Sequence, residues 1–183
     1  MTPQTQRAIT PSVTIGRMDS PIGPLWLAVA DASAVAVYWR DGNRRQESDD
    51  DTRQADTAQA DTAQADASAD VIPPGLRGDL HSRGLHDLHL NHDGVDLLRV
   101  PLARYFRGEA LADVPVSWVG MTPFTAAVLT ALNNLPTGAL TTYGGLARAT
   151  GRSIGTARAI GGAVGRNPLP IVVPCHRVLA GDN

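Results

Sequence analysis

The stretch Asn167-Pro168-Leu169-Pro170-Ile171-Val172-Val173-Pro174-Cys175-His176-Arg177-Val178 contains the single cysteine of this 183-residue chain. A lone thiol cannot form an internal disulfide, and it cannot supply several thiolates to a metal ion. Cys175 is therefore either a small buried hydrophobic residue or a reactive nucleophile. His176 and Arg177 follow it directly and bring positive charge, which favours the thiolate and hence the nucleophile.

Two prolines restrict how the backbone reaches this cysteine. A residue that precedes proline is held near extended geometry, and proline cannot donate to a central strand ladder. We therefore expect Pro170 and Pro174 to shape a structural turn that presents Cys175 at the edge of the fold. Across that turn, or through one water, His176 could accept the thiol proton.

The charge of the chain is unevenly placed. Residues 44–70 hold three arginines against eight acidic residues, a net charge of −5, whereas residues 137–183 hold five arginines against one aspartate, a net charge of +4. The chain contains no lysine, so all its side-chain cations other than histidine are guanidinium groups, which make bidentate contacts with phosphate. A basic C-terminal part suits an anionic partner such as nucleic acid.

No targeting segment is visible in the sequence. Residues 1–13 contain no run long enough for a signal-peptide core, and no apolar stretch approaches the length of a membrane span. We therefore expect a cytoplasmic protein that does not enter a membrane, in a compartment that keeps a lone thiol reduced.

The N-terminal part predicts strands, and residues 1–43 are interpreted as the first part of a β-rich domain. Apolar runs of strand length cover residues 13–15, 25–30 and 34–39, and the polar residues 31–33 predict a hairpin. From Asp51 a five-residue repeat follows that contains no large apolar residue. We therefore expect residues 44–90 to be a disordered acidic, alanine-rich linker.

Four histidines lie near the end of this segment, at positions 81, 86, 89 and 92. Such spacing on a helix could gather metal ligands, but Gly84 and Gly94 interrupt it, and no cysteine or glutamate completes a ligand set. We therefore expect solvated histidines and neither a metal nor a cofactor.

The remaining sequence predicts helices. Residues 95–108 form the first, within a segment 91–120 that completes the N-terminal domain. In residues 121–183, Thr122 is expected to cap a second helix, Thr142 a third and Ser153 a fourth. The last two form a helix-turn-helix pattern with arginines on its outer side, which by itself is a weak indication of DNA binding, and the paired Gly161 and Gly162 fit either close approach of another backbone or tight helix packing.

Several motifs together resemble the O6-alkylguanine-DNA alkyltransferases, the methylated-DNA–protein-cysteine methyltransferases. The resemblance is dense from Thr122 to Val178 and looser over 18–25 and 102–108. It implies an α/β (α+β) fold with a ribonuclease-H-like N-terminal domain and a winged-helix-like C-terminal domain. The motifs are Thr142-Tyr143, Gly145-Leu146-Ala147, Ala157-Arg158-Ala159-Ile160-Gly161-Gly162-Ala163, Asn167-Pro168 and Pro170-Ile171-Val172-Val173-Pro174-Cys175-His176-Arg177-Val178.

The resemblance also implies a function, namely DNA repair by irreversible, single-turnover transfer of an alkyl group from O6-alkylguanine or O4-alkylthymine to Cys175. His176 would act as the base, and Tyr143, Arg158, Asn167 and Arg177 would be the DNA-binding residues. Among these, Tyr143 would help to swing the nucleotide out, Arg158 would fill the vacated stack and Asn167 would brace the active-site turn. The partner would be double-stranded DNA bound by a monomer.

The sequence departs from the family pattern at its end. It stops at Asn183, before the glycine-rich lid, the terminal helix and the histidine-orienting glutamate of the family. This leaves an alternative, a family member that binds the lesion but transfers poorly, and a third hypothesis, a cysteine hydrolase. The cysteine-ligated zinc site of some members cannot be built with one cysteine.

Overall fold

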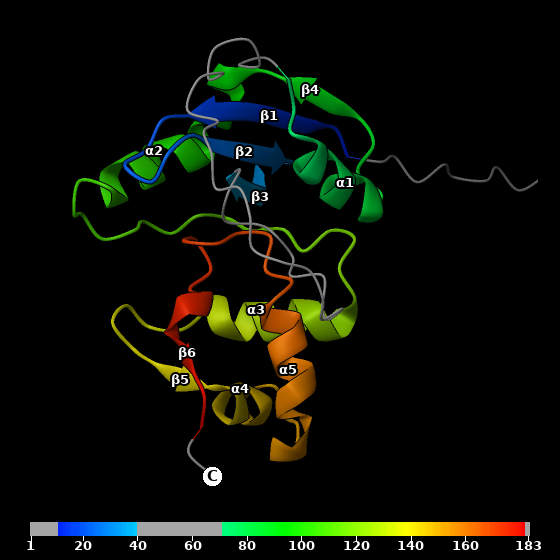
Figure 1. Ribbon diagram of the computed structural model, residues 1–183, viewed down its shortest axis with the longest axis vertical. Coiled ribbons are helices and arrows are strands. Elements are labelled where there is room, and N and C mark those ends of the chain that lie inside the picture. Colours follow the sequence, from blue (N-terminus) through cyan, green and yellow to red (C-terminus); the bar gives the residue numbers. More distant parts are fainter. Residues whose placement is uncertain (1–10, 40–70, 182–183) are drawn as a thin grey trace, which may run out of the picture.

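A four-stranded sheet forms one layer of the fold (Figure 1). The computed structural model describes residues 11–39 and 71–181. The strands are β1 (Val13–Met18), β2 (Leu25–Ala30), β3 (Ser33–Trp39) and β4 (Leu88–Leu90). Their order is β3-β2-β1-β4, in which the two hairpin pairs are antiparallel and β1 and β4 are parallel.

The turn between β2 and β3 confirms the hairpin that the sequence predicts. Asp31 and Ala32 have φ angles of 47° and 55°. Two successive left-handed residues match the right-handed twist of the strands that they join. All six residues of β2 are buried, as expected for a central strand whose two faces are both covered.

Helices cover both faces of the sheet. Helix α1 (Pro74–Ser82) buries Leu76 and Leu80 against one face. Helix α2 (Asp96–Tyr105) and the helices of the C-terminal half pack on the other face, in one continuous cluster of buried side chains. Full burial of Leu76 or Leu80 contributes about 2 kcal/mol to the stability of the fold. The C-terminal half therefore shares a hydrophobic core with the sheet and is not a separate domain joined to it only by a linker.

The expectation of a disordered linker over residues 44–90 is wrong for residues 71–90. Ile72, Leu76, Leu80 and Leu85 are buried, and β4 adds a strand to the sheet. Leu76 and Leu80 are four residues apart and so lie on one side of α1. This spacing indicates a helix, but the surrounding glycines and histidines mask it in the sequence. Residues 44–70, which carry the repeat, lie outside the described residues.

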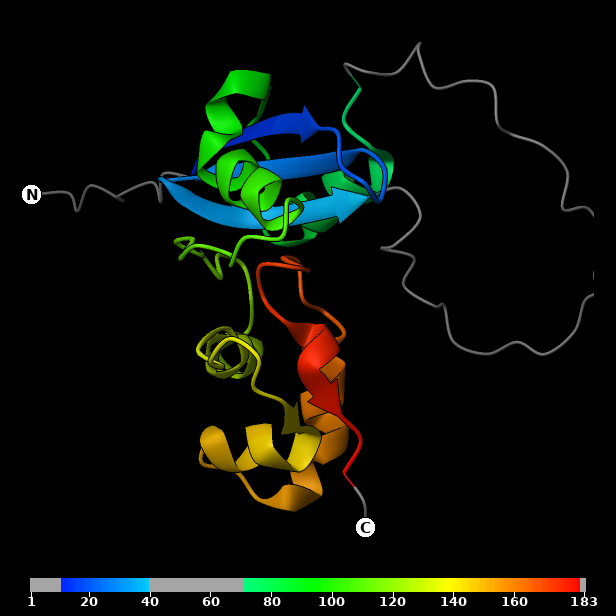
Figure 2. The same cartoon turned by 90° about the vertical axis from the view of Figure 1, so that its left-hand side faces the viewer.

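The C-terminal half is built from three helices and a small parallel sheet (Figure 2). The helices are α3 (Pro123–Asn133), α4 (Tyr143–Ala149) and α5 (Ala157–Val164), and a 3₁₀ turn, Ile154–Thr156, precedes α5. The two short strands are β5 (Thr141–Thr142) and β6 (Val178–Leu179). With the sheet of the N-terminal part, these elements confirm the expected α+β class.

Two of the three expected helix caps carry the predicted hydrogen bond. The hydroxyl of Thr122 accepts from the amide of Thr125 at 3.2 Å, and that of Thr142 accepts from Gly145 at 2.9 Å. Ser153 precedes the 3₁₀ turn and makes no capping hydrogen bond, so the prediction of its cap is wrong. The tight turn there moves the start of the α-helix to Ala157.

The connection between the two halves is tied down by a buried arginine. Arg83 lies just after α1, and its side chain is 4% exposed. Its Nε donates to the carbonyl of Val119 at 3.1 Å, and one amino group donates to the carbonyl of Val35 in β3 at 2.8 Å. Burial lowers the pKa of Arg83, and the nearby Asp79 carboxylate acts in the opposite direction. One guanidinium thus joins α1, the sheet and the segment that leads into α3.

No helix of residues 11–39 or 71–181 is long and apolar enough to cross a membrane. The domain boundaries at 43 and 120 stay predictions, whereas the boundary at 90 falls with the linker, because β4 (Leu88–Leu90) is part of the sheet.

Candidate active site

Cys175 begins a single 3₁₀ turn, Cys175–Arg177, directly after Pro174. The thiol-bearing residue is half-buried and packs against the edge of the main hydrophobic cluster. Its amide donates to the carbonyl of Val173 at 2.9 Å, and the amide of Arg177 donates to Pro174 at 3.0 Å. The turn therefore holds the cysteine at the boundary between core and solvent, where a thiol can be reached.

The chain before Cys175 adopts a strained conformation. Ile171 has a φ of 73°, which is unusual for a residue branched at Cβ and costs about 1–2 kcal/mol. Neighbouring hydrogen bonds hold it in place, because the amide of Val173 donates to Leu169 at 2.8 Å and the amide of Val37 in β3 donates to Pro168 at 2.8 Å. A backbone reversal at Ile171 turns the chain toward the cysteine.

Asn167 braces this reversal from inside. It is 8% exposed, its side-chain nitrogen donates to the carbonyl of Val173 at 3.0 Å, and its side-chain oxygen accepts from the amide of Leu169 at 3.0 Å. One amide side chain therefore satisfies two buried backbone groups on either side of the strained residue. This geometry gives Asn167 a bracing role within the turn.

Replacement of Asn167 by leucine is expected to lower the free energy of unfolding by about 2–4 kcal/mol, because it leaves two buried backbone groups unpaired. Urea unfolding would measure the loss. The matched control is Asn134→Leu at the exposed end of α3, where we expect a change within about 0.5 kcal/mol. Equal losses in the two variants would contradict the bracing role.

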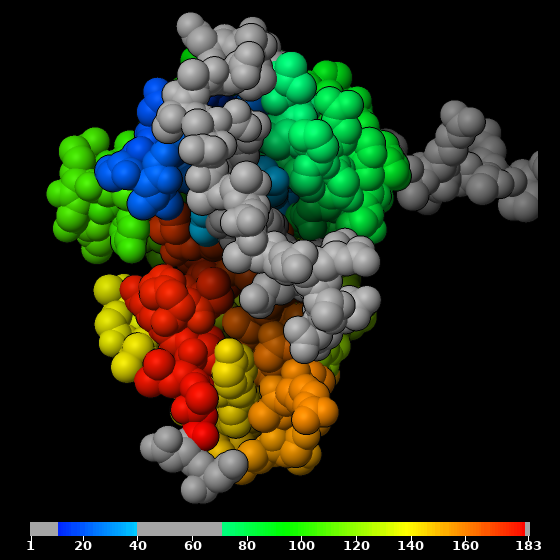
Figure 3. Space-filling model, in the orientation of Figure 1, coloured from blue at the N-terminus to red at the C-terminus, as the bar shows by residue number. Residues whose placement is uncertain are grey.

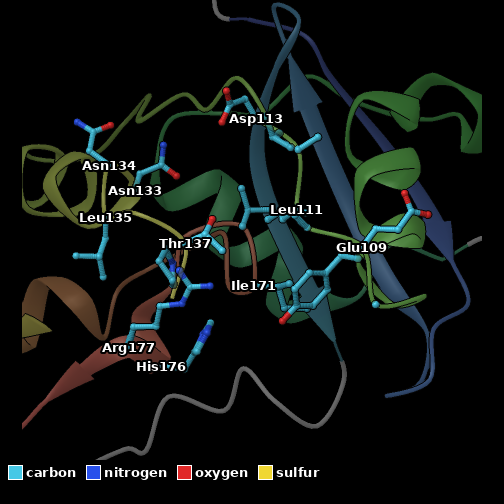
Figure 4. Close-up of a pocket in the computed structure, with 17 residues that line it drawn as sticks. Glu109, Leu111, Asp113, Asn133, Asn134, Leu135, Thr137, Ile171, His176 and Arg177 are labelled. Carbon is cyan, nitrogen blue, oxygen red and sulfur yellow. The ribbon is translucent and has the colours of Figure 1, made fainter. Parts of the chain in front are cut away.

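A cavity of about 600 Å³ lies beside the cysteine turn (Figure 4). His176, which is exposed, and Arg177 line it from the turn, and the labelled Glu109 lies on the opposite side. Arg104 and Arg107 hold Glu109, at 2.7 and 3.2 Å, and the hydrogen bond from Arg104 is the main cause that lowers the pKa of Glu109. His176 and Arg177 line this cavity, whereas Cys175 does not.

Tyr143 is the first residue of α4 and is half-buried against the main cluster. A side chain at Gly161 would place its Cβ 3.7 Å from the Tyr143 ring. The glycine thus lets the ring lie over α5 in ordinary contact. The ring of Tyr143 therefore lies beside α5.

Residues of α4, α5 and β6 share one exposed face (Figure 3). Arg148 on α4 and Arg158 on α5 are exposed, and so is Arg166 just after α5. Arg152 instead lies 4.7 Å above the ring of Phe124 in α3 and so holds the turn between the helices against the core. Exposed guanidinium groups can neutralise phosphates without regard to base sequence.

Metal ligands are not gathered in the part of the chain that the structure describes. Within residues 11–39 and 71–181, no group of three His, Cys, Asp or Glu side chains could hold a metal ion. His81 and His86 contact each other at 5.0 Å between ring centres, and His92 accepts from the amide of Arg17 at 3.0 Å.

Comparisons with known proteins point in one direction. Residues 123–183 match the family model described as the DNA-binding domain of 6-O-methylguanine DNA methyltransferase. A methylated-DNA–protein-cysteine methyltransferase of Salmonella typhimurium is 41% identical over 173 residues, which cover 89% of this chain and 80% of that protein. One of Thermococcus kodakarensis is 39% identical over 122 residues, 58% of this chain and 67% of that protein.

Solved structures agree with these sequences. The crystal structure of a Mycobacterium tuberculosis OGT in complex with DNA is similar to this chain with a TM-score of 0.62 and 26% identity. The similarity covers 92% of this chain and 79% of that protein.

Proposed function

Because this chain belongs to the methylated-DNA–protein-cysteine methyltransferase family, we propose that it repairs DNA by moving an alkyl group from O6-alkylguanine to its own Cys175. The single observation that carries the proposal is the placement of Cys175. Its thiol side chain is half-buried at a braced turn, beside an exposed histidine and next to a helix-turn-helix with exposed arginines. O4-alkylthymine is proposed as a second substrate, and the protein is proposed to act as a cytoplasmic monomer.

The transfer step balances without a further reactant. His176 accepts the proton of the Cys175 thiol, directly or through one water, and the thiolate attacks the alkyl carbon. The sulfur–carbon bond forms as the bond between that carbon and O6 breaks, and the guanine leaves with the proton. The thioether product is not hydrolysed, so each protein molecule acts once.

The lesion must leave the base stack before a thiol can reach it. Extrusion of a nucleotide costs a few kcal/mol, and protein groups that replace the lost stacking lower this cost. Tyr143 is proposed to help to swing the nucleotide out, and Arg158 is proposed to fill the space that the base vacates. The two residues come from packed helices, because the Tyr143 ring of α4 lies beside Gly161 of α5, the helix that carries the exposed Arg158.

The proposal is tested by incubating the protein with a duplex that contains one O6-methylguanine. We expect intact-mass analysis to find one added methyl group per protein molecule, and peptide mapping to place it on Cys175. The same duplex with guanine should add no mass. Binding of the methylated duplex with no added mass would overturn alkyl transfer and would leave lesion binding alone.

Arg158→Ala is expected to slow transfer from the methylated duplex at least about tenfold, because more than about 1.4 kcal/mol of help in extrusion is lost. Binding to single-stranded DNA should fall much less, since no base has to be replaced there. Single-turnover rates and binding titrations measure both quantities. Arg148→Ala serves as the control for loss of one exposed arginine, and equal loss of transfer and of single-strand binding in R158A would contradict the proposed role.

A further inference from the structure

Arg177 is placed differently from the three exposed arginines of the C-terminal half. It is half-buried in the 3₁₀ turn Cys175–Arg177, whereas Arg148, Arg158 and Arg166 are exposed. One of its amino groups donates to the carbonyl of Pro136 at 3.4 Å. Figure 4 shows its side chain beside Thr137, on the wall of the cavity that follows α3. The guanidinium thus faces the end of α3 and not the outer side of the helix-turn-helix.

The end of α3 is a favourable place for a cation. The last carbonyls of a helix carry partial negative charge, and a basic side chain close to them is stabilising. The last turn of α3 contains no basic residue of its own. Arg177 lines the same cavity as Asn133 and Asn134 at the end of α3, and it contacts the carbonyl of Pro136 from a segment forty-one residues further along the chain.

The carbonyl that Arg177 contacts belongs to a turn that leads to Tyr143. The amide of Ala139 donates to the same Pro136 carbonyl at 3.0 Å, which closes the turn. Two residues after Ala139, β5 begins and pairs in parallel with β6, with Thr141 opposite Val178. β5 in turn ends at Thr142, the cap of α4. Arg177 and the β5–β6 pair therefore join the two segments that present Cys175 and Tyr143.

We infer that Arg177 is a positioning residue for alkyl transfer, which sets the placement of Cys175 relative to Tyr143, and that it is not a phosphate contact. This replaces the sequence-based assignment of Arg177 to DNA binding. The inference rests on the proposed function, because it concerns the geometry of acceptor and extruded base in that reaction.

The two roles differ in their dependence on salt. A phosphate contact contributes about 0.9 to the slope of the logarithm of the binding constant against the logarithm of salt concentration. We expect Arg177→Gln to keep the wild-type slope and a dissociation constant within about twofold of wild type. Arg148→Gln, on the exposed face, is the comparison variant and should lose about 0.9 of the slope.

The transfer rate at saturating methylated duplex provides the second measurement. A residue that only stabilises the fold would leave this rate unchanged in the folded protein. We expect R177Q to slow transfer about tenfold and Arg177→Lys about threefold, because lysine keeps the charge near α3 but not the planar fork. A lost salt slope with an unchanged saturated rate in R177Q would overturn the inference.

If R177Q does not fold, R177K decides the question. A saturated transfer rate of R177K about threefold below wild type supports the positioning role, and a wild-type rate overturns it, because lysine could still contact a phosphate but cannot reproduce the planar fork. If the wild-type protein transfers no methyl group at all, the proposed function fails, but the salt slope of R177Q still decides whether Arg177 contacts phosphate.

Discussion

Cys175→Ser is expected to take up no methyl group from a duplex with O6-methylguanine and to bind that duplex as tightly as the wild type. Serine is close to cysteine in size, so the half-buried position and the braced turn should persist. A hydroxyl stays protonated and is a far weaker nucleophile than a thiolate, so the transfer rate should fall at least about a thousandfold. Intact mass over time and a binding titration measure the two properties.

The control for this prediction is the fold of the variant itself. Urea unfolding of C175S should differ from wild type by less than about 1 kcal/mol, since the thiol makes no buried polar contact that serine would break. Methyl uptake by C175S at another side chain would show that the acceptor has been assigned wrongly. Loss of duplex binding together with transfer would instead show that the substitution disturbs the turn.

Gly120→Ala is expected to lower the free energy of unfolding by at least about 3 kcal/mol. Gly120 has a φ of 73°, and an added Cβ would lie 2.1 Å from the backbone oxygen of Arg83 and 2.6 Å from its Cα. A backbone atom cannot rotate aside as a side chain can. Arg83 is also held by its own hydrogen bonds to Val119 and Val35, so the clash must displace the connection into α3.

The matched control is Gly108→Ala, just after α2. Gly108 also has a positive φ, of 88°, but nothing lies within 4 Å of an added Cβ. Gly108→Ala should lower the free energy of unfolding by only about 1 kcal/mol, which is the cost of holding an alanine in the left-handed conformation. Urea unfolding of both variants separates the cost of the left-handed backbone from the cost of the clash with Arg83. Equal decreases in the free energy of unfolding would contradict the tight contact between Gly120 and Arg83.

Local signals predicted much of the fold correctly. The caps at Thr122 and Thr142 are hydrogen bonds between residues three apart in the chain, so the sequence alone contains both partners. The hairpin at Asp31 is local for the same reason. α1 was missed because its two glycines and its histidine resemble a linker, and its leucines gain stability only against the sheet.

The candidate active site also has features that local sequence predicts and features that it does not. The run Pro174-Cys175-His176-Arg177 singled out the thiol, because residue types that make a cysteine reactive stand next to it in the chain. The direction of Arg177 could not be predicted, since its partner Pro136 is forty-one residues away. The role of Arg83 was equally hidden, because the two carbonyls that accept from it come from β3 and from the connection to α3.

The sequence by itself determined the lone nucleophile, the helix-turn-helix and the family, because these depend on residue type and on short spacings. The tertiary structure alone decided that α1 covers the sheet, that Asn167 satisfies two backbone groups around the strained Ile171, and that Arg177 contacts Pro136 in the turn after α3. The physical reason is that burial and charge pairing act between segments brought together only by folding. An isolated stretch of sequence contains one partner of each such interaction.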